Sequence, residues 1–283
     1  MAQIHFTKMH GIGNDYIYID CFKEKIENPE HLAKIMSPRR TSVGSDGLIL
    51  ICPSDMADAK MRMFNMDGSE GKMCGNGIRC VGKYIYDNGI ARKGTVTVET
   101  LSGIKTLKID AKNGKAVSVT VNMGKPVLNP ADIPVKFDGD IMVNEPITAG
   151  GTEYRITAVS MGNPHAVVFC DDPDSLNLEK LGPLFEFNPI FPEQVNTEFI
   201  RVIDGKTLKM RVWERGSGET FACGTGACAA VVAAVLNGYC KKDEEITVRL
   251  KCGDLTINYS GDGCVYMRGT AEKVYEGVYC CEP

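Results

Sequence analysis

Short runs of alternating apolar and polar residues cover most of the chain and predict β-strands. Turn-forming residues separate these runs, and Asn113-Gly114 is a strong hairpin signal. Strand-like alternation covers residues 4–21, with a break at 11–14 after which the strand resumes at 16–19. Further strands are expected at residues 48–51, 60–66, 154–160, 166–169, 199–202, 208–213, 245–250, 254–259, 264–268 and 273–278, with a strand–turn–strand unit over 95–121. Residues 29–36 and 176–185 are expected to form short helices.

Two further stretches predict helices of one common design. Each begins with a cysteine followed by Gly-x-Gly, at Cys74 and at Cys223. Each ends at Asn-Gly, at residues 88–89 and 237–238, and glycine after the last helical residue is a common C-terminal signal. The sequence therefore predicts two helices that each carry a cysteine at the N-terminus.

The second of these helices is small and apolar on every face, from Ala227 to Leu236. A helix that is apolar all round is buried, and small side chains allow close approach of its surroundings. We therefore expect a mixed α/β (α+β) protein in which each half wraps a curved mixed sheet, or barrel, around a central helix.

The two halves are related by a fixed offset. Cys223 follows Cys74 by 149 positions (223 minus 74), and other identical residues match at that same offset. These pairs are Asn14 with Asn163, Arg62 with Arg211, Glu70 with Glu219 and Asn88 with Asn237. Several matches at one offset indicate an internal duplication. We predict one domain at residues 1–123, completed by a C-terminal strand from 271–283, and a second domain at 124–270.

Composition and charge exclude several classes of protein. Hydrophobic residues make up 43% of the chain and charged residues 24%, as in ordinary globular proteins. The formal charge is −4 with no lysine or arginine block, so nucleic acid is not an expected partner. No apolar run reaches the roughly 18 residues of a membrane span, and no signal peptide is evident. We expect a cytoplasmic protein with no membrane partner.

Twelve cysteines is a high count. An extracellular disulfide framework fits poorly with the length and the scattered spacing, and no Cys-x-x-Cys zinc pattern occurs. We therefore expect no metal. Most of the other cysteines are expected to be small buried hydrophobic residues: Cys21, Cys52, Cys170, Cys240, Cys252 and Cys264.

The position of Cys74 and Cys223 has a chemical meaning. A helix N-terminus presents free N–H groups and a partial positive charge, which favour a thiolate and can also hold a carboxylate. Two such units in one chain suggest two thiols that serve one anionic ligand. Asn14, alone, would be explained as a turn residue, but its repeat at Asn163 favours a functional role.

Over essentially its full length, the sequence resembles the diaminopimelate epimerase family. The matching segments are HGIGNDY, FNMDGSEGKMCGNGIRC, SMGNPHAV, VNTEF and VWERGSGETFACGTGACA. Proline racemases and hydroxyproline epimerases share the two-cysteine plan, and they form the alternative. They resemble this chain less, because they usually carry His where Asn76 stands.

The resemblance implies inversion of one α-carbon of LL-2,6-diaminopimelate to the meso form, in lysine and peptidoglycan precursor biosynthesis. It implies no pyridoxal phosphate, metal or other cofactor, a site between two pseudo-symmetric domains, and a homodimer. Inversion needs a base on one face of the carbon and an acid on the other. Cys74 and Cys223 would fill these roles as one thiolate and one thiol.

The resemblance also assigns roles to further residues. Substrate contacts carry over onto Asn14, Asn65, Gly75, Asn76, Asn163, Asn196, Glu214, Arg215, Gly224 and Thr225. His165 and Glu214 match residues that tune the cysteine pair, and Tyr275 matches a dimer contact. Gly47 departs from the family, since several members have Gln there, and it cannot supply that side-chain contact.

Arg215 suits bidentate binding of the distal carboxylate, with Glu214 on an ammonium group. Asn65, Asn163 and Asn196 would complete this distal centre. The plainer alternatives are an exposed Glu214–Arg215 ion pair and a packed, hydrogen-bonded His165. A thiol-based metal or redox protein that uses Cys74, Cys80, Cys223 and Cys228 is a rival from a different class.

Overall fold

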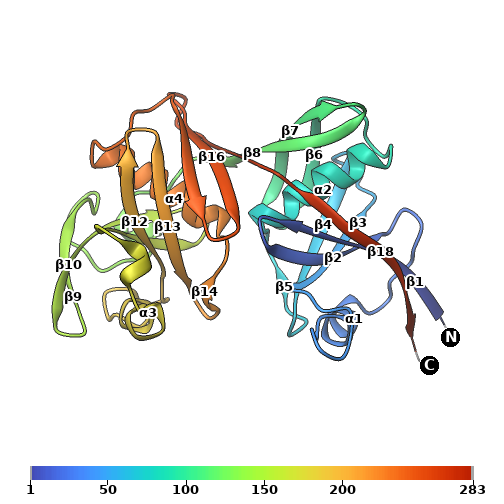
Figure 1. Cartoon of the computed structure of the whole chain (residues 1–283), viewed down its shortest axis with the longest axis horizontal. Helices are drawn as coiled ribbons and strands as arrows, with labels where there is room; N and C mark the ends of the chain where they lie inside the picture. Colours follow the sequence, from blue (N-terminus) through green and yellow to red (C-terminus); the bar gives the residue numbers. More distant parts are fainter. Residues whose placement is uncertain (1, 282–283) are drawn as a thin grey trace. The chain divides into compact units, whose positions relative to one another are not determined.

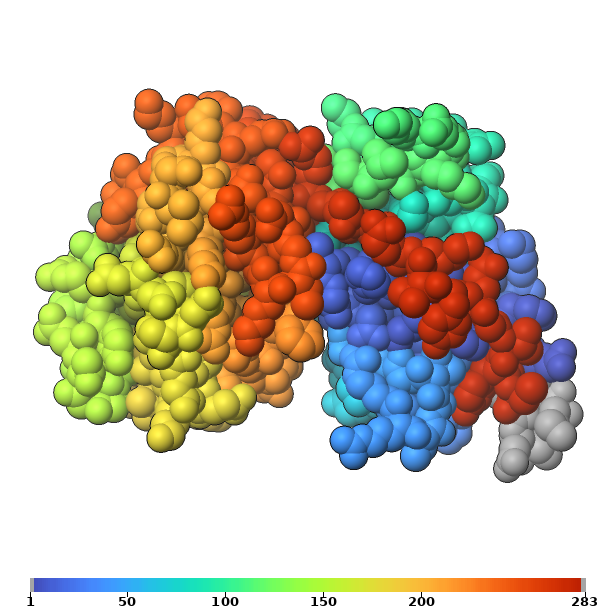
Figure 2. Space-filling view, in the orientation of Figure 1, coloured from blue at the N-terminus to red at the C-terminus, as the bar shows by residue number. Residues whose placement is uncertain are grey.

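Strands from the two ends of the chain pair with each other in the computed structural model, which describes residues 2–281. β1 (Ala2–Gly11) runs antiparallel to β18 (Glu272–Cys281), and Lys8 lies opposite Tyr275. Figure 2 shows this C-terminal strand in red beside blue N-terminal residues. One compact unit contains the described parts of Met1–Val121 and Arg268–Pro283, and a second contains Asn122–Met267. The second unit is therefore an insertion within the first.

The first unit is a mixed sheet around one helix (Figure 1). Parallel pairing joins β2 to β3 and β4 to β6, whereas β3–β4, β4–β5, β6–β7 and β7–β8 are antiparallel. The strands are β2 (Asn14–Asp20), β3 (Gly47–Cys52), β4 (Ala59–Asn65), β5 (Glu70–Gly71), β6 (Thr95–Thr100), β7 (Gly103–Lys112) and β8 (Lys115–Gly124). Helix α2 (Gly75–Asp87) contacts β1, β2, β4, β6 and β7.

The second unit repeats this order of pairings. β11–β12 and β13–β15 are parallel, and β12–β13, β13–β14 and β15–β16 are antiparallel, in the same sequence as β2 to β7. The strands are β9 (Glu145–Ala149), β10 (Thr152–Ser160), β11 (Pro164–Phe169), β12 (Asn196–Asp204), β13 (Thr207–Glu214), β14 (Gly218–Thr220), β15 (Glu245–Leu250), β16 (Gly253–Tyr259) and β17 (Val265–Gly269). The shared order confirms the mixed α/β fold of two similar halves.

Helix α4 (Gly224–Leu236) is the centre of the second unit. Residues 227–234 are all completely buried, and the helix contacts β10, β11, β12, β13, β15 and β16. Strands therefore cover the helix on several sides, as its uniformly apolar sequence predicts. Both central helices end as expected, with Asn88 and Asn237 as C-caps.

Two smaller helices lie on the sheets. The helix α1 (Pro29–Met36) has the predicted bounds and packs through Leu32 and Met36 into an apolar cluster with β2, β3 and β4. The helix α3 (Leu178–Glu186) packs on Trp213, whose ring lies where a Cβ on Gly182 would stand. Single-turn 3₁₀ helices occur at η1 (Pro130–Asp132) and η2 (Pro173–Ser175).

The prediction that the remaining cysteines are buried is largely wrong. Cys240 is buried, but Cys252 is exposed, and the others in that group are only partly covered. These cysteines stand at strand ends or in turns, where one side of the residue faces solvent. Cys21 and Cys52 lie at the ends of adjacent strands, where their thiols hydrogen-bond.

Candidate functional site

The Cys74 centre is built by a tight turn and a helix start. Cys74 is the N-cap of α2, and its Sγ accepts a hydrogen bond from the N–H of Gly77 at 3.3 Å. The thiol also donates to Asn14 Oδ1 at 3.3 Å. Asn14 follows the two-residue turn between β1 and β2, in which Ile12 and Gly13 both have positive φ. Such turns match the twist of paired strands and fix where the next side chain points.

Arg79 supports the first turn of α2 and was not among the predicted site residues. Its side chain is completely buried and donates to Gly75 O at 3.2 Å, Asn76 Oδ1 at 3.0 Å and Thr270 O at 3.2 Å. Asn76 is itself only 3% exposed. Arg79 therefore joins the helix start to the segment just before β18.

The Cys223 centre has the same backbone design. Cys223 is the N-cap of α4, its Sγ accepts from the N–H of Gly226 at 3.3 Å, and Thr225 Oγ1 lies 3.5 Å away. The pKa of the Cys223 thiol is raised well above its ordinary value. Burial is the main cause, and the nearby Glu214 and Glu198 charges add to it. Burial also raises the pKa of Glu214, which hydrogen-bonds with Thr220 and Cys223. A raised pKa favours the protonated thiol of Cys223 before a ligand binds.

A buried histidine–glutamate pair lies beside this centre. His165 Nδ1 lies 2.7 Å from Glu198 Oε1, His165 Nε2 lies 3.1 Å from Asn163 Oδ1, and His165 and Glu198 are both 0% exposed. Glu198 also faces the first turn of α4, since a Cβ on Gly226 would lie 2.5 Å from Glu198 Oε1. Glu198 was missed from the sequence, although it stands inside the VNTEF segment. Tyr16 and Ile49 are the first-half equivalents of His165 and Glu198.

The Asn196 side chain hydrogen-bonds to the backbone of Arg215. Asn196 Nδ2 donates to Pro164 O at 2.7 Å, and its Oδ1 accepts from the backbone N–H of Arg215 at 3.0 Å. The Arg215 guanidinium donates to Glu193 O at 2.8 Å and is exposed, so it keeps further donors for a ligand. Asn196 here holds the Arg215 turn in place.

The remaining predicted residues fall into the two units. Asn65 ends β4, is exposed, and donates to Ser69 Oγ at 3.0 Å. Gly75 and Gly224 are the first residues of α2 and α4, directly after the two cysteines. Tyr275 lies on β18 with 43% of its surface exposed.

Gly47 stands where the backbone of β4 leaves no space for a side chain. Its φ is +156°, and an added Cβ would lie 2.1 Å from Phe64 O and 3.0 Å from the Tyr16 ring. Any other residue therefore requires the backbone of β3 or β4 to shift. This chain therefore has no room at residue 47 for a side chain such as that of glutamine.

Gly47→Ala should lower the free energy of unfolding by about 2–3 kcal/mol, because strain and a backbone clash combine. Gly89→Ala is the control, since Gly89 has φ +78° but nothing within 4 Å of an added Cβ. That change should cost only about 1 kcal/mol. Urea unfolding of both variants measures the difference, and equal losses would contradict the proposed clash.

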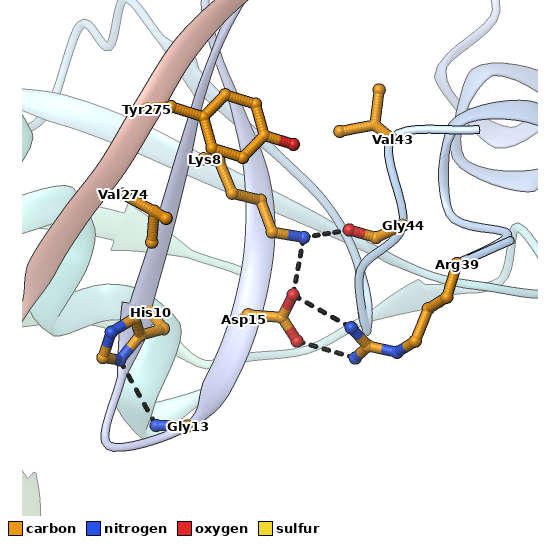
Figure 3. Close-up of a pocket in the computed structure, with 9 residues that line it drawn as sticks. All are labelled: Lys8, His10, Gly13, Asp15, Arg39, Val43, Gly44, Val274 and Tyr275. Atoms are coloured by element: carbon orange, nitrogen blue, oxygen red, sulfur yellow. Dashed lines mark hydrogen bonds and ion pairs between the residues drawn. The ribbon is translucent and has the colours of Figure 1, made fainter.

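A charged cluster behind Asn14 lines a pocket of ≈ 340 Å³ (Figure 3). Asp15 lies between Lys8 Nζ, at 2.5 Å, and a bidentate Arg39 at 2.7 and 3.2 Å. Burial lowers the pKa of Lys8, while hydrogen bonds from Arg39 and Lys8 outweigh burial and lower the pKa of Asp15. The lowered pKa of Asp15 favours its carboxylate, whereas burial works against the charge of Lys8 and the contact with Asp15 only partly offsets it.

Two other structural findings bear on ligands. Within residues 2–281, no three His, Cys, Asp or Glu side chains gather as a metal site requires. None of the helices in that range is long and apolar enough to cross a bilayer.

Comparison with known proteins places the chain in a family. The diaminopimelate epimerase family model matches residues 6–129 and 157–274. A diaminopimelate epimerase from Acetivibrio thermocellus is 56% identical over 97% of this chain and 98% of its own, and one from Methanococcus maripaludis is 55% identical over 96% and 98%.

Solved structures share the fold at much lower identity. A hydroxyproline epimerase from Agrobacterium vitis aligns with a TM-score of 0.72 at 16% identity, covering 98% of this chain and 92% of its own. A PhzF-family phenazine biosynthesis protein from Bacillus anthracis aligns with a TM-score of 0.74 at 18% identity, covering 99% and 100%. The sequence matches decide between these relatives: the chain belongs to the diaminopimelate epimerase family.

Proposed function

We propose that this protein is an enzyme that interconverts LL-2,6-diaminopimelate and meso-diaminopimelate by inverting one α-carbon. The observation that carries the proposal is the repeated helix start, in which Cys74 and Cys223 each cap a helix and accept an N–H hydrogen bond. The names of relatives at 55–56% identity supply the substrate.

The mechanism we propose uses the two thiols as an acid–base pair. In each direction one cysteine is the thiolate that removes the α-proton, and the other is the thiol that donates a proton to the opposite face. The thiolate takes the proton as the C–H bond breaks, the electron pair stays on the carbon, and the second thiol then protonates it. The chain's own groups supply the acid, the base and the stabilising N–H donors.

The helix N-termini have a second role in this mechanism. The α-proton of an amino acid is very weakly acidic, so negative charge that develops on the α-carboxylate has to be stabilised. Gly75–Asn76 and Gly224–Thr225 present the backbone N–H groups that follow the two cysteines. We infer that these groups bind the α-carboxylate, and that Asn14 and Asn163 contribute further contacts.

Glu214 and His165 are proposed to adjust the cysteine chemistry. Glu214 hydrogen-bonds with Cys223, and burial raises its carboxyl pKa, while the Glu214 charge helps to raise the pKa of the Cys223 thiol. His165 lies between Asn163 and Glu198 and holds the position of Asn163.

Solvent exchange tests the proposed reaction. In D₂O, each pure stereoisomer should gain deuterium at the α-carbon as it converts to the other, because the donated proton comes from a solvent-exchanged thiol. Proton NMR follows the exchange, and proline and hydroxyproline serve as competing substrates. Turnover of proline without turnover of diaminopimelate would overturn the substrate assignment.

Arg215 is proposed to bind the distal carboxylate, with Asn65, Asn163 and Asn196 completing that centre. Arg215→Lys should lower kcat/KM for diaminopimelate at least tenfold, or about 1.4 kcal/mol, because lysine cannot form the planar bidentate pair. Steady-state kinetics measures this loss.

Thr225→Val serves as a comparison for Arg215→Lys, since Thr225 lies near Cys223 and should affect the reacting carbon more than distal recognition. Wild-type enzyme should barely convert lysine, which lacks the second carboxylate. Full activity of Arg215→Lys, or efficient racemisation of lysine, would place distal recognition elsewhere.

We also propose a homodimer that works in the cytoplasm. Val274, Tyr275 and Val278 on β18 are 54%, 43% and 46% exposed, so this strand carries uncovered apolar side chains. A second copy of the chain would cover such side chains. Sedimentation analysis of wild type and Tyr275→Ser would test the proposal.

A further inference from the structure

We propose that Asp46 is a positioning residue for Cys74: it fixes the orientation of the Asn14 amide so that Asn14 Oδ1, and not its NH₂ group, faces the Cys74 sulfur. This inference rests on the proposed function for its effect on catalysis. Its structural part concerns only contacts within the first unit.

The contacts of Asp46 allow only one amide orientation. Asp46 Oδ2 accepts from Asn14 Nδ2 at 2.8 Å and from the backbone N–H of Asp15 at 3.0 Å. A carboxylate cannot donate, so the Asn14 group that faces it has to be the NH₂. The Asn14 oxygen is therefore the group turned toward Cys74, 3.3 Å away.

The carboxylate is itself held from several sides. Asp46 Oδ1 accepts a hydrogen bond from Arg39 Nη2 at 2.6 Å, and the backbone N–H of Asp46 donates to Asp15 O at 2.8 Å. Arg39 in turn binds Asp15, which Lys8 also binds (Figure 3). The backbone contacts with Asp15 place Asp46, Arg39 adds a further contact, and Asp46 Oδ2 holds the Asn14 amide.

The orientation matters because the two ends of an amide act oppositely on a thiol. An oxygen accepts the S–H hydrogen bond and favours the protonated form, whereas an NH₂ group would donate to sulfur and favour the thiolate. Other titratable groups near Cys74 are the phenols of Tyr16 and Tyr18 and the buried Cys80 thiol. Of these, Tyr16 hydrogen-bonds with both Cys74 and Asn14.

The second unit has no counterpart of the hydrogen bond between Asp46 and Asn14. At the repeat offset, Pro164 stands in place of Asp15 and Val195 in place of Asp46. Asn163, the counterpart of Asn14, instead meets His165 through its oxygen. A change at Asp46 should therefore act on Cys74 and leave Cys223 unchanged, which provides an internal control in the same molecule.

Asp46→Ala and Asp46→Asn separate orientation from charge. Both remove a negative charge near Cys74, but asparagine keeps an oxygen that can accept from Asn14 Nδ2, whereas alanine leaves the Asn14 amide with Tyr16 as its remaining neighbour, and the phenol can donate as well as accept. Arg39→Gln is the matched control, because it disrupts the cluster yet leaves the Asp46–Asn14 contact. Removing a cation can only raise the pH at which Cys74 ionises.

The measurement is the pH dependence of iodoacetamide alkylation, followed for the Cys74 and Cys223 peptides separately by mass spectrometry. For Asp46→Ala we expect the Cys74 midpoint to fall by about one pH unit, because the thiol loses the fixed acceptor that favours its protonated form. Asp46→Asn should shift it less, Arg39→Gln should not lower it, and the Cys223 profile should match wild type in all three. Epimerisation by Asp46→Ala should fall about tenfold in kcat.

Equal Cys74 shifts in Asp46→Ala and Asp46→Asn, or no shift in either, would overturn the positioning role. If Asp46→Ala does not fold, Asp46→Ser takes its place, because its side chain stops short of Asn14. If the proposed two-thiol function is wrong, the result differs: Cys74→Ala will remain active. The alkylation profiles will still report the orientation of the Asn14 amide.

Discussion

Replacing either Cys74 or Cys223 by alanine should reduce epimerisation at least about 100-fold in both directions, because each variant lacks one of the two proton-transfer groups. One remaining thiol can act on only one face of the α-carbon, so the second half of the inversion loses its acid or its base. The rate of α-deuterium incorporation in D₂O, together with the ratio of stereoisomers, measures the loss.

Serine provides the matched control for each cysteine. Both sulfurs accept an N–H hydrogen bond at a helix start, and serine also caps helices well, so Cys→Ser keeps the local structure. Alanine lacks the cap and should lower the free energy of unfolding by about 1 kcal/mol. Because a hydroxyl is a much weaker acid than a thiol, the serine variants should be as inactive as the alanine variants. Wild-type rates in either Cys74→Ala or Cys223→Ala would end the two-thiol mechanism.

Glu198→Ala should lower the free energy of unfolding by about 1–3 kcal/mol, because it leaves the buried His165 imidazole without its hydrogen-bond partner. His165 and Glu198 are both 0% exposed, and the imidazole would lose the carboxylate 2.7 Å from its Nδ1. Denaturation in urea measures the change. Glu198→Gln should cost less, because the amide oxygen can still accept from the ring.

The repeat supplies an unusual control for this pair. The first unit has Tyr16 and Ile49 at the positions of His165 and Glu198, and Ile49 meets Gly77 as Glu198 meets Gly226. The double variant His165→Tyr with Glu198→Ile should therefore be more stable than Glu198→Ile alone. Together with wild type and His165→Tyr, these variants complete a double-mutant cycle, which gives the coupling energy between the two residues. A double variant no more stable than the single one would show that the buried pair is not the source of the loss.

Local patterns in the sequence carry enough information for the main elements. The apolar composition of α4 predicts its burial, and Cys-Gly-x-Gly and Asn-Gly mark where both central helices begin and end, because capping depends on neighbouring residues. The strands β5 and β14 were not predicted, since each is only a short pairing inside a glycine-rich turn. β9 was missed because it lies in a segment rich in proline and glycine.

Site residues that depend on tertiary contacts were harder to find. Asp46 and Glu198 each approach their partner from another strand or loop, so neither shows a local spacing that reveals the contact. Arg79 stands inside the recognised cysteine motif, but only the packing explains a buried guanidinium at the start of a helix. Comparing the halves position by position offers one usable signal, since Glu198 is charged where its counterpart Ile49 is apolar.

The pairing of β1 with β18 also bears on synthesis of the chain. The residues of the second unit all leave the ribosome before β18 does, so this unit can fold while the first unit still lacks a strand. Until β18 arrives, one edge of β1 has no partner, and open strand edges invite pairing with other chains. A chain that is terminated before residue 272 would therefore have a complete second unit and an aggregation-prone first unit. Such a product is a substrate for chaperones or proteases.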